Sequence, residues 1–177
     1  MQALEFFKIV TADKANLLER LLKLLDDNNI RFCVISSVAA GAYAEPLVGL
    51  DFDIVVTSYQ LGRFESLLTN TFRVKRTSRQ IEITMPNSDL RVNVLTETRF
   101  ADFVERAERR ALLGMTLPVA RAEDVLQSIV WQNQDTARAK WKRQKDLADV
   151  MRLLLANPKL EAQVPAPLLT KLRASGE

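Results

Sequence analysis

The sequence predicts an α/β fold of the α+β type, in which helices flank a mixed β-sheet and a helical C-terminal portion follows. Apolar runs at 31–35 and 50–56 predict two strands on either side of a helix of small residues at 36–44. Two further runs, 81–85 and 90–95, flank a turn-forming segment and predict a hairpin. The last third of the chain has the apolar spacing of helices.

The N-terminal elements follow from leucine spacing and from helix-breaking residues. A helix is predicted over 12–28, and the polar run 27–29 ends it. Pro46 and Gly49 separate the small-residue helix from the second strand. The leucines of the predicted helix form one broad apolar face: Leu17, Leu18, Leu21, Leu22, Leu24 and Leu25.

Thr57 and Gln60 have the spacing of a capping box, which predicts a helix running through Leu68. Three further segments are predicted between this helix and the C-terminal portion: a strand at 72–75, a helix at 99–109, and an irregular stretch containing Gly114 and Pro118.

The C-terminal portion is predicted to be helical, with helices at 123–134 and 137–155. We therefore expect an α/β core over residues 1–120 and a helical portion over 121–177. The two parts should pack together as one compact domain, which is the usual organisation for a chain of 177 residues.

The composition excludes several classes of site. The chain contains no histidine, which rules out Ser-His-Asp and Cys-His hydrolases and His-ligated zinc or iron. Its single cysteine, Cys33, has no intrachain disulfide partner and lies in an apolar run, so we expect a buried core residue. No segment is apolar enough to span a membrane, and a cytoplasmic protein is expected. A net charge of +3 does not by itself indicate a nucleic-acid binder.

The most informative motif is Asp51-Phe52-Asp53 in the second predicted strand. Residues two apart in a strand point to the same face, so the two carboxylates should lie side by side. Like charges held this close usually share a divalent cation. The motif therefore predicts a Mg²⁺ site, with a solvated strand end as the alternative.

Taken with its neighbours, this motif resembles the nucleotidyltransferase superfamily, in the minimal branch that includes abortive-infection toxins. Ser36-Ser37 stands where that family has a Gly-Gly or Gly-Ser pair, at the expected spacing before the Asp pair. The segment from Arg143 to Asp149 matches the Arg-x-Lys-Asp-x-x-Asp pattern of the final helix. The resemblance covers roughly residues 31–155.

The chain departs from the family pattern at several positions. The glycine pair is replaced by serines, and the third carboxylate of the family is Asn93. An amide oxygen can contact a cation but cannot accept the proton of an attacking hydroxyl. Three other polar family positions are Leu47, Gly49 and Ile129 here. The resemblance thus implies a degenerate active site, for which Glu82 or Glu97 would be a substitute carboxylate.

The resemblance also implies roles for individual residues. Asp51, Asp53 and the degenerate position Asn93 would be the catalytic set, with Mg²⁺ held by Asp51 and Asp53. The nucleotide would contact Ser36, Ser37 and Lys145. The implied activity is transfer of a nucleoside monophosphate from a nucleoside triphosphate to a hydroxyl of an RNA or protein acceptor, weak or lost in this chain.

Two alternatives remain open. One is an inactive relative that binds nucleotide or a protein partner; a cleft filled by Leu47 would favour it, and an open cleft lined by Asp51 and Asp53 would favour the enzyme. The other is an RNA-binding module, based on a basic cluster in the last helix. The members of that cluster are Arg138, Lys140, Lys142, Arg143 and Lys145.

Several residues also have purely structural interpretations. Ser36-Ser37 can cap the small helix, and Asp146 and Asp149 can form ion pairs on an exposed helix face. Both tryptophans, Trp131 and Trp141, are expected to be packing residues.

Overall fold

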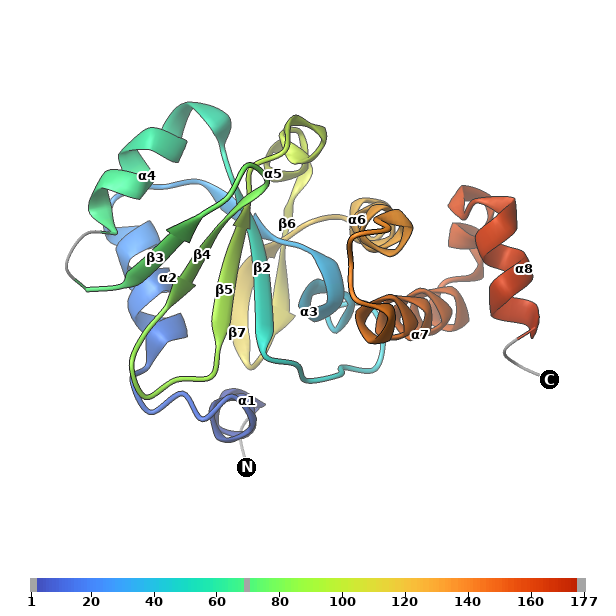
Figure 1. The fold of residues 1–177 in the computed structure, drawn as a ribbon, viewed down its shortest axis with the longest axis horizontal. Coiled ribbons are helices and arrows are strands. Elements are labelled where there is room, and N and C mark those ends of the chain that lie inside the picture. The colour runs from blue at the N-terminus through green and yellow to red at the C-terminus, as the bar shows by residue number, and fades with distance from the viewer. Residues whose placement is uncertain (1–2, 69–70, 175–177) are drawn as a thin grey trace.

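A computed structural model describes residues 3–68 and 71–174. In these residues, seven strands form one mixed sheet in the order β3-β4-β5-β2-β1-β7-β6 (Figure 1). The central pairs β2–β5 and β1–β7 are parallel, and the remaining pairs are antiparallel. The fold class expected from the sequence is therefore confirmed. The strands are β1 (Phe32–Val34), β2 (Asp51–Val56), β3 (Arg73–Arg76), β4 (Gln80–Thr84), β5 (Arg91–Leu95), β6 (Glu108–Leu112) and β7 (Met115–Val119).

Eight α-helices and three short 3₁₀ segments accompany these strands in the described residues. The helices are α1 (Ala3–Val10), α2 (Leu17–Asp27), α3 (Ser36–Ala40), α4 (Leu61–Leu67), α5 (Phe103–Arg106), α6 (Ala122–Gln134), α7 (Lys140–Ala156) and α8 (Ala166–Ala174). The 3₁₀ segments are η1 (Ser58–Gln60), η2 (Thr98–Phe100) and η3 (Pro158–Gln163).

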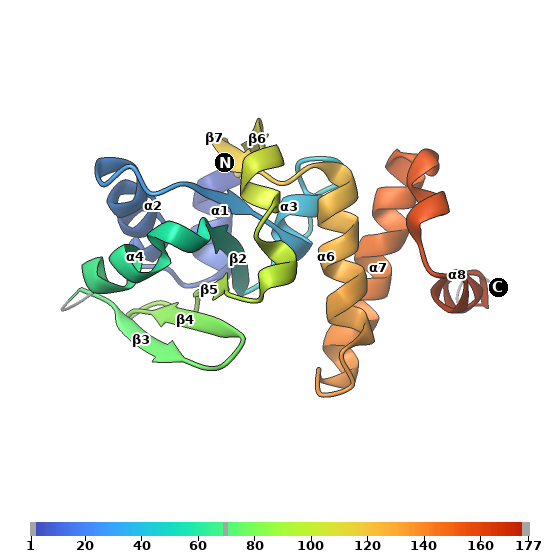
Figure 2. The same cartoon turned by 90° about the horizontal axis from the view of Figure 1, so that it is seen from above.

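Helices α6 and α7 lie side by side at the end of the molecule opposite α2 and α4, with α8 on the outer side of α7 (Figures 1 and 2). The short helix α3 contacts both α6 and α7. This contact brings the α7 side chains over the end of β2. The division of the chain at residue 120 stays a prediction.

Strand β2 shows the alternation that its sequence predicts. Phe52 and Ile54 are fully buried on one face, and the Phe52 ring meets Phe7 of α1 edge to face, with the ring centroids 6.4 Å apart. Asp51 and Asp53 lie on the other face and are only partly buried. The apolar half of the strand thus anchors β2 in the core and leaves both carboxylates available to a site.

The predicted helix at 12–28 is wrong at its start, because α2 begins at Leu17. Ala12 and Asn16 have positive φ angles of 46° and 55°, which are incompatible with a continuous helix. The buried carboxylate of Asp13 accepts hydrogen bonds from the backbone N–H groups of Leu17 (2.9 Å) and Leu18 (3.4 Å). Asp13 therefore satisfies the first free donors of the helix. Helix α1 was not predicted.

The predicted helix at 99–109 is also wrong. Only η2 and the one-turn α5 form in this region, and the chain then enters the β6–β7 hairpin, which includes the stretch predicted to be irregular. Leu113 and Gly114 connect the two strands with φ angles of 53° and 76°. Positive φ at both central residues is the geometry of a tight hairpin turn. Gly114 was a signal for this turn, but leucine at the first position concealed it.

The capping box predicted for Thr57 and Gln60 does not form. The Thr57 hydroxyl donates to the side-chain oxygen of Gln60 (2.7 Å), not to a backbone group as the motif requires. The Gln60 side chain instead binds the segment just before β1: it accepts a hydrogen bond from the backbone N–H of Arg31 and donates one to the carbonyl of Asn29. The hairpin predicted at 81–85 and 90–95 is confirmed as β4–β5.

Candidate functional site

A cleft of about 510 Å³ opens between the sheet and helix α7. Strands β2, β5 and β4 form its floor, and helices α3, α6 and α7, the segment 48–50 and Arg138 supply its other walls. Asp51 and Asp53 of β2 are paired in register with Arg91 and Asn93 of β5. Because β2 and β5 are parallel neighbours, these four side chains come together on the cleft face.

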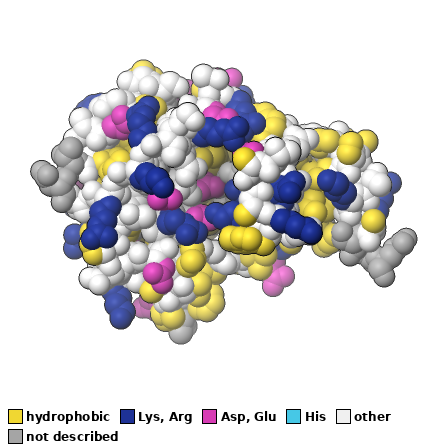
Figure 3. All heavy atoms as spheres, viewed as in Figure 1, with side chains coloured by type: hydrophobic (Ala, Val, Ile, Leu, Met, Phe, Trp, Pro, Cys, Tyr) yellow, Lys and Arg dark blue, Asp and Glu magenta, His cyan; other side chains and the backbone are white. Residues whose placement is uncertain are grey.

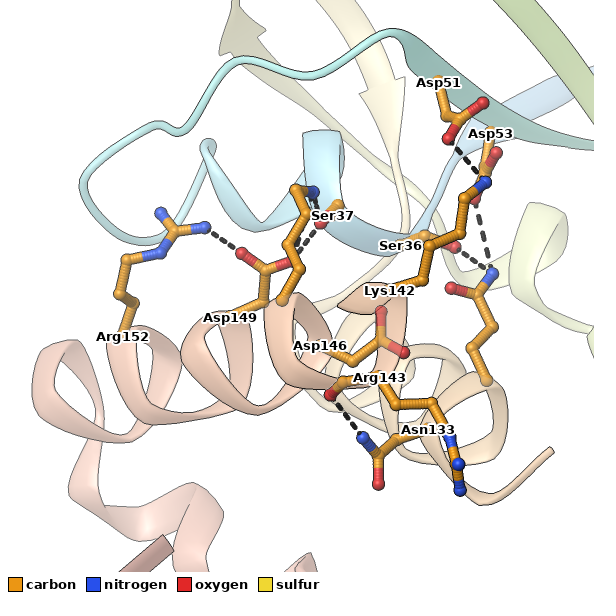
Figure 4. A network of polar contacts seen from close by, with 12 residues as sticks. Ser36, Ser37, Asp51, Asp53, Asn133, Lys142, Arg143, Asp146, Asp149 and Arg152 are labelled. Carbon is orange, nitrogen blue, oxygen red and sulfur yellow. Dashed lines mark hydrogen bonds and ion pairs between the residues drawn. The ribbon is translucent and has the colours of Figure 1, made fainter. Parts of the chain in front are cut away.

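Each carboxylate oxygen of Asp51 contacts a different cation. Oδ1 accepts from Nε of Arg91 at 2.7 Å. Oδ2 accepts from Nζ of Lys142 at 3.1 Å, a contact shown in Figure 4. Burial by itself raises the pKa of Asp51, but the hydrogen bonds and charges of Arg91 and Lys142 outweigh burial and hold the pKa below its ordinary value. Asp51 is therefore an ionised, fully paired carboxylate.

Asp53 is held by amides. Its Oδ1 accepts from Nδ2 of Asn93 at 2.8 Å, and its Oδ2 accepts from Nε2 of Gln132 in α6 at 3.3 Å. The Asn93 oxygen accepts in turn from Gln80 of β4 at 3.2 Å. Asn93 is buried, so the third carboxylate position is occupied by an amide whose donor and acceptor are both used.

The two serines of the expected glycine pair have different surroundings. Ser36 is buried with a φ of 60°, a left-handed conformation that glycine adopts without strain. Its hydroxyl accepts from Gln132 at 2.9 Å. Ser37 lines the cleft, and its hydroxyl donates to Asp149 of α7 and accepts from Lys145. Neither hydroxyl caps α3, because Ile35 is the N-cap residue and makes no side-chain cap.

The acidic residues of α7 are buried, so the prediction of an exposed charged face is wrong for them. Asp149 is fully buried, accepts hydrogen bonds from Ser37 and Arg152 (Figure 4), and forms an ion pair with Lys145 at 3.6 Å. Asp146 forms a two-point ion pair with Arg138, at 2.8 and 2.9 Å. Burial raises the pKa of Asp146 despite this pair. These contacts fix α7 against α3 and aim Lys142 and Lys145 at the cleft.

No protein-family model and no curated protein sequence matches the chain. Solved structures do match its fold. The complex of ANT(2")-Ia with adenylyl-2"-tobramycin superposes with a TM-score of 0.63 at 14% identity, covering 91% of this chain and 97% of that one. The solution structure of the antibiotic-resistance factor ANT(2'')-Ia has a TM-score of 0.57 at 15% identity, covering 90% and 88%.

The lincosamide antibiotic adenylyltransferase LnuA, bound to lincomycin, superposes with a TM-score of 0.53 at 8% identity, covering 77% of this chain and 95% of that one. The chain has the nucleotidyltransferase fold. The superfamily resemblance drawn from the Asp pair is thus confirmed for the fold, and the abortive-infection toxin-like branch stays a prediction.

The carboxylates of this nucleotidyltransferase fold do not fit a Mg²⁺ ion as they stand. Magnesium is attracted by uncompensated carboxylate charge, whereas the charge of Asp51 is already neutralised by Arg91 and Lys142, and the amide N–H groups of Asn93 and Gln132 point at Asp53. In the described part of the chain, no three acidic or cysteine side chains cluster closely enough to hold a metal. The Mg²⁺ site predicted at Asp51 and Asp53 stays a prediction.

The two candidate substitute carboxylates differ in position. Glu82 lines the cleft and is paired in register with Asn93 from the neighbouring strand β4. Glu97 does not line the cleft and contacts Arg99 at 3.1 Å. Glu82 is therefore the one carboxylate of the two that could act on a group bound near Asn93.

The cleft is open, and Leu47 does not fill it. Leu47 lines a separate apolar pocket of about 160 Å³ beside α1. Lys and Arg side chains lie among Asp and Glu side chains over the middle of the face in Figure 3, which looks onto the sheet and α7. By the criterion set out from the sequence, the open cleft favours the enzyme, whereas the amide at Asn93 counts against full activity.

The tryptophans have opposite surroundings. Trp131 packs in a ring cluster, stacked on Phe103 at 6.0 Å between centroids, as expected. Trp141 is 65% exposed and lines the cleft mouth beside Lys142, so the expectation that it is a packing residue is wrong.

Sequence reasoning missed Arg91, Gln132, Lys142 and Trp141 as cleft residues. Arg91 stands two residues before Asn93 in β5 and shares its face, a signal that the strand pattern contained. Lys142 stands three residues before Lys145 on one helix face. Gln132 carried no signal, because only the packing of α6 brings it to Asp53.

No helix of the described residues is both long and apolar enough to span a bilayer.

Proposed function

We propose that the protein binds a nucleoside triphosphate in this cleft and transfers nucleotidyl groups slowly or not at all. The observation that carries the proposal is the contact between Asn93 and Asp53, at 2.8 Å. Asn93 occupies the position of the third carboxylate of a nucleotidyltransferase site and has a similar shape, but it is an uncharged amide. The fold shared with two antibiotic-modifying proteins supports nucleotide as the ligand.

The expected loss of activity follows from proton transfer. A hydroxyl that attacks the α-phosphorus must give up its proton, and a carboxylate near the attacking oxygen normally accepts it. The Asn93 amide cannot accept that proton. The bound triphosphate would be positioned by Ser37, Lys142 and Lys145, which line the cleft.

The charges of the cleft bear on the acceptor. Among the described lining residues the basic side chains are Arg91, Arg138, Lys142 and Lys145, and the acidic ones are Asp51, Asp53 and Glu82. Asp51 is already paired with two of those cations. A polycationic acceptor such as an aminoglycoside would find few free carboxylates, so an RNA or a protein hydroxyl is the better acceptor.

Thermal unfolding with each of the four ribonucleoside triphosphates, with Mg²⁺ and with EDTA, tests nucleotide binding. A ligand at about a hundred times its dissociation constant adds about 2.7 kcal/mol of stability. The shift should shrink in Lys145→Ala and persist in Lys140→Ala, since Lys140 is exposed on the same helix outside the cleft. No shift with any triphosphate would refute the proposal.

A second candidate is an active transferase in which Glu82 replaces the missing carboxylate. Its position opposite Asn93 on the cleft face favours it. Transfer of label from α-³²P nucleotides to RNA and to protein measures the activity directly. Under the first proposal, wild type shows little transfer and Asn93→Asp increases it. Ready transfer by wild type that Glu82→Gln abolishes would establish the second candidate instead.

An RNA-binding module receives less support from the structure. Three members of the basic cluster are engaged within the protein: Arg138 with Asp146, Lys142 with Asp51, and Lys145 with Asp149. All three line the cleft, so they can reach a triphosphate inside it but do not form an extended basic surface for an RNA chain. A steep fall of RNA affinity with salt would be needed to revive this function.

A further inference from the structure

The Asp51 carboxylate is bracketed by two cations from different elements. Arg91 reaches it from the neighbouring strand and Lys142 from α7, each bound to its own oxygen. Together they bring two positive charges, the charge of one divalent ion, to the place where such an ion would sit. Their side chains are 37% and 28% exposed, so both are at the cleft surface rather than in the core.

The second carboxylate of the pair, Asp53, is bound by two uncharged amide groups. Asn93 and Gln132 each donate one N–H to it, so none of the four oxygens of the Asp pair is left without a donor. A carboxylate oxygen has two lone pairs, so these hydrogen bonds do not by themselves block a metal. A divalent ion at the pair would bring its charge beside the Lys142 ammonium and the Arg91 guanidinium, and this repulsion opposes metal binding.

We propose that Lys142 and Arg91 replace the divalent cation of the nucleotidyltransferase fold, so that the cleft binds polyphosphate groups without metal. Lys142 is the group that contacts the phosphate, because a lysine ammonium has three donors on a flexible stem and can bind Asp51 and a phosphate oxygen together. Lys145, one turn further along α7, supplies a second ammonium in the same cleft. The proposal deepens the proposed function and rests on it only for the nucleoside part of the ligand.

The arrangement of α7 supports this assignment. Lys145 contacts the Ser37 hydroxyl and lies 3.6 Å from the buried Asp149, so these two residues are its partners in this structure. Lys142 has one ion-pair partner in the described residues, Asp51, across the cleft. The ammonium of Lys142 is therefore held over the cleft by the very carboxylate that would otherwise bind metal.

Two probes test the proposal: Mn²⁺ as the metal, followed by electron paramagnetic resonance, and inorganic tripolyphosphate in EDTA, followed by calorimetry. The exposed Trp141 lies 5.5 Å from the Lys142 ammonium, and its fluorescence gives an independent readout of anion binding. Wild type should bind tripolyphosphate in EDTA and show no saturable Mn²⁺ binding at millimolar concentration.

The double variant Lys142→Met with Asn93→Asp should reverse both properties. Removing the ammonium frees one oxygen of Asp51, and the new carboxylate adds a third ligand, so Mn²⁺ binding should appear. Affinity for tripolyphosphate in EDTA should fall at least about tenfold, the scale expected for loss of a charged contact. Lys140→Met, which removes an exposed lysine outside the cleft, is the matched control and should change neither property.

The wild-type measurements decide the proposal even if the double variant does not fold. Tight Mn²⁺ binding by wild type, or tripolyphosphate binding that needs the metal, would overturn it, as would no binding of tripolyphosphate at all. Tripolyphosphate binding in EDTA without any triphosphate response would support this inference while refuting the proposed function. Triphosphate binding that requires Mg²⁺ would support the proposed function and refute this inference.

Discussion

Asp149 is the buried charge on which the packing of α7 against α3 depends, and its removal is the sharpest stability test. The side chain is fully buried, accepts hydrogen bonds from Ser37 and Arg152, and forms an ion pair with Lys145. Asp149→Ala removes the carboxylate and leaves its cationic partners uncompensated. Removing one partner of a buried ion pair typically costs about 3–5 kcal/mol.

The lower end of that range applies here, because the Lys145 side chain is 34% exposed and can turn to solvent, whereas Arg152 is 16% exposed. We therefore expect a loss of about 3 kcal/mol. With a urea dependence of about 2 kcal/mol per molar, the unfolding midpoint should fall by about 1.5 M. Circular dichroism at pH 7 measures the midpoint.

The matched control is Lys23→Ala. It breaks the Lys23–Asp27 ion pair on α2, whose side chains are 75% and 54% exposed, and should change stability by less than about 0.5 kcal/mol. Asp149→Asn keeps an acceptor but loses the charge, so its midpoint should fall between those of wild type and Asp149→Ala. A midpoint for Asp149→Ala within about 0.3 M of wild type would refute the reasoning, since that is only about 0.6 kcal/mol.

Three further predictions concern single side chains. Ser36→Ala should destabilise the protein by about 1 kcal/mol through loss of the Gln132 hydrogen bond, whereas Ser36→Gly should lose less because glycine relieves the strain of a φ of 60°; urea unfolding that ranks them in reverse order would contradict this. The ionised Asp51, whose pKa is lowered, stabilises the fold above the ordinary carboxyl pKa of about 3.9, and this contribution is lost as the pH falls through the lower folded value. Wild type should thus be more stable than Asp51→Asn at neutral pH and lose that advantage in acid, and an equal difference at both pH values would count against the ion pairs. Burial raises the pKa of the Cys33 thiol, so Ellman's reagent should react with it only after unfolding in urea, and rapid labelling of the native protein would show that the site is open.

Much of the architecture could be predicted because it depends on local pattern. Alternation along β2, the turn before β5 and the apolar spacing of α6 and α7 each act over a few residues. The burial of Cys33 followed from its apolar neighbours in β1 and is confirmed. The β6–β7 hairpin was missed because Leu113 adopts a positive φ that leucine rarely has.

The candidate site could be predicted only in part. The Asp pair and Asn93 were correctly placed on strands, but only the structure shows that these two strands are parallel neighbours. Their functional roles stay predictions. The exposed helix face expected for Asp146 and Asp149 was wrong because α3 and Arg138 cover those carboxylates. Sequence spacing within α7 could not show which face the rest of the protein buries.

The sequence by itself determined which side chains share a strand face, and hence that Asp51 and Asp53 lie together with Phe52 behind them. Only the tertiary structure decided what those carboxylates contact. Lys142 lies 91 residues from Asp51 along the chain, and Gln132 lies 79 residues from Asp53. Side-chain direction along a strand follows from the local backbone, whereas these partners meet only because α6 and α7 pack against α3, and that packing depends on the whole core.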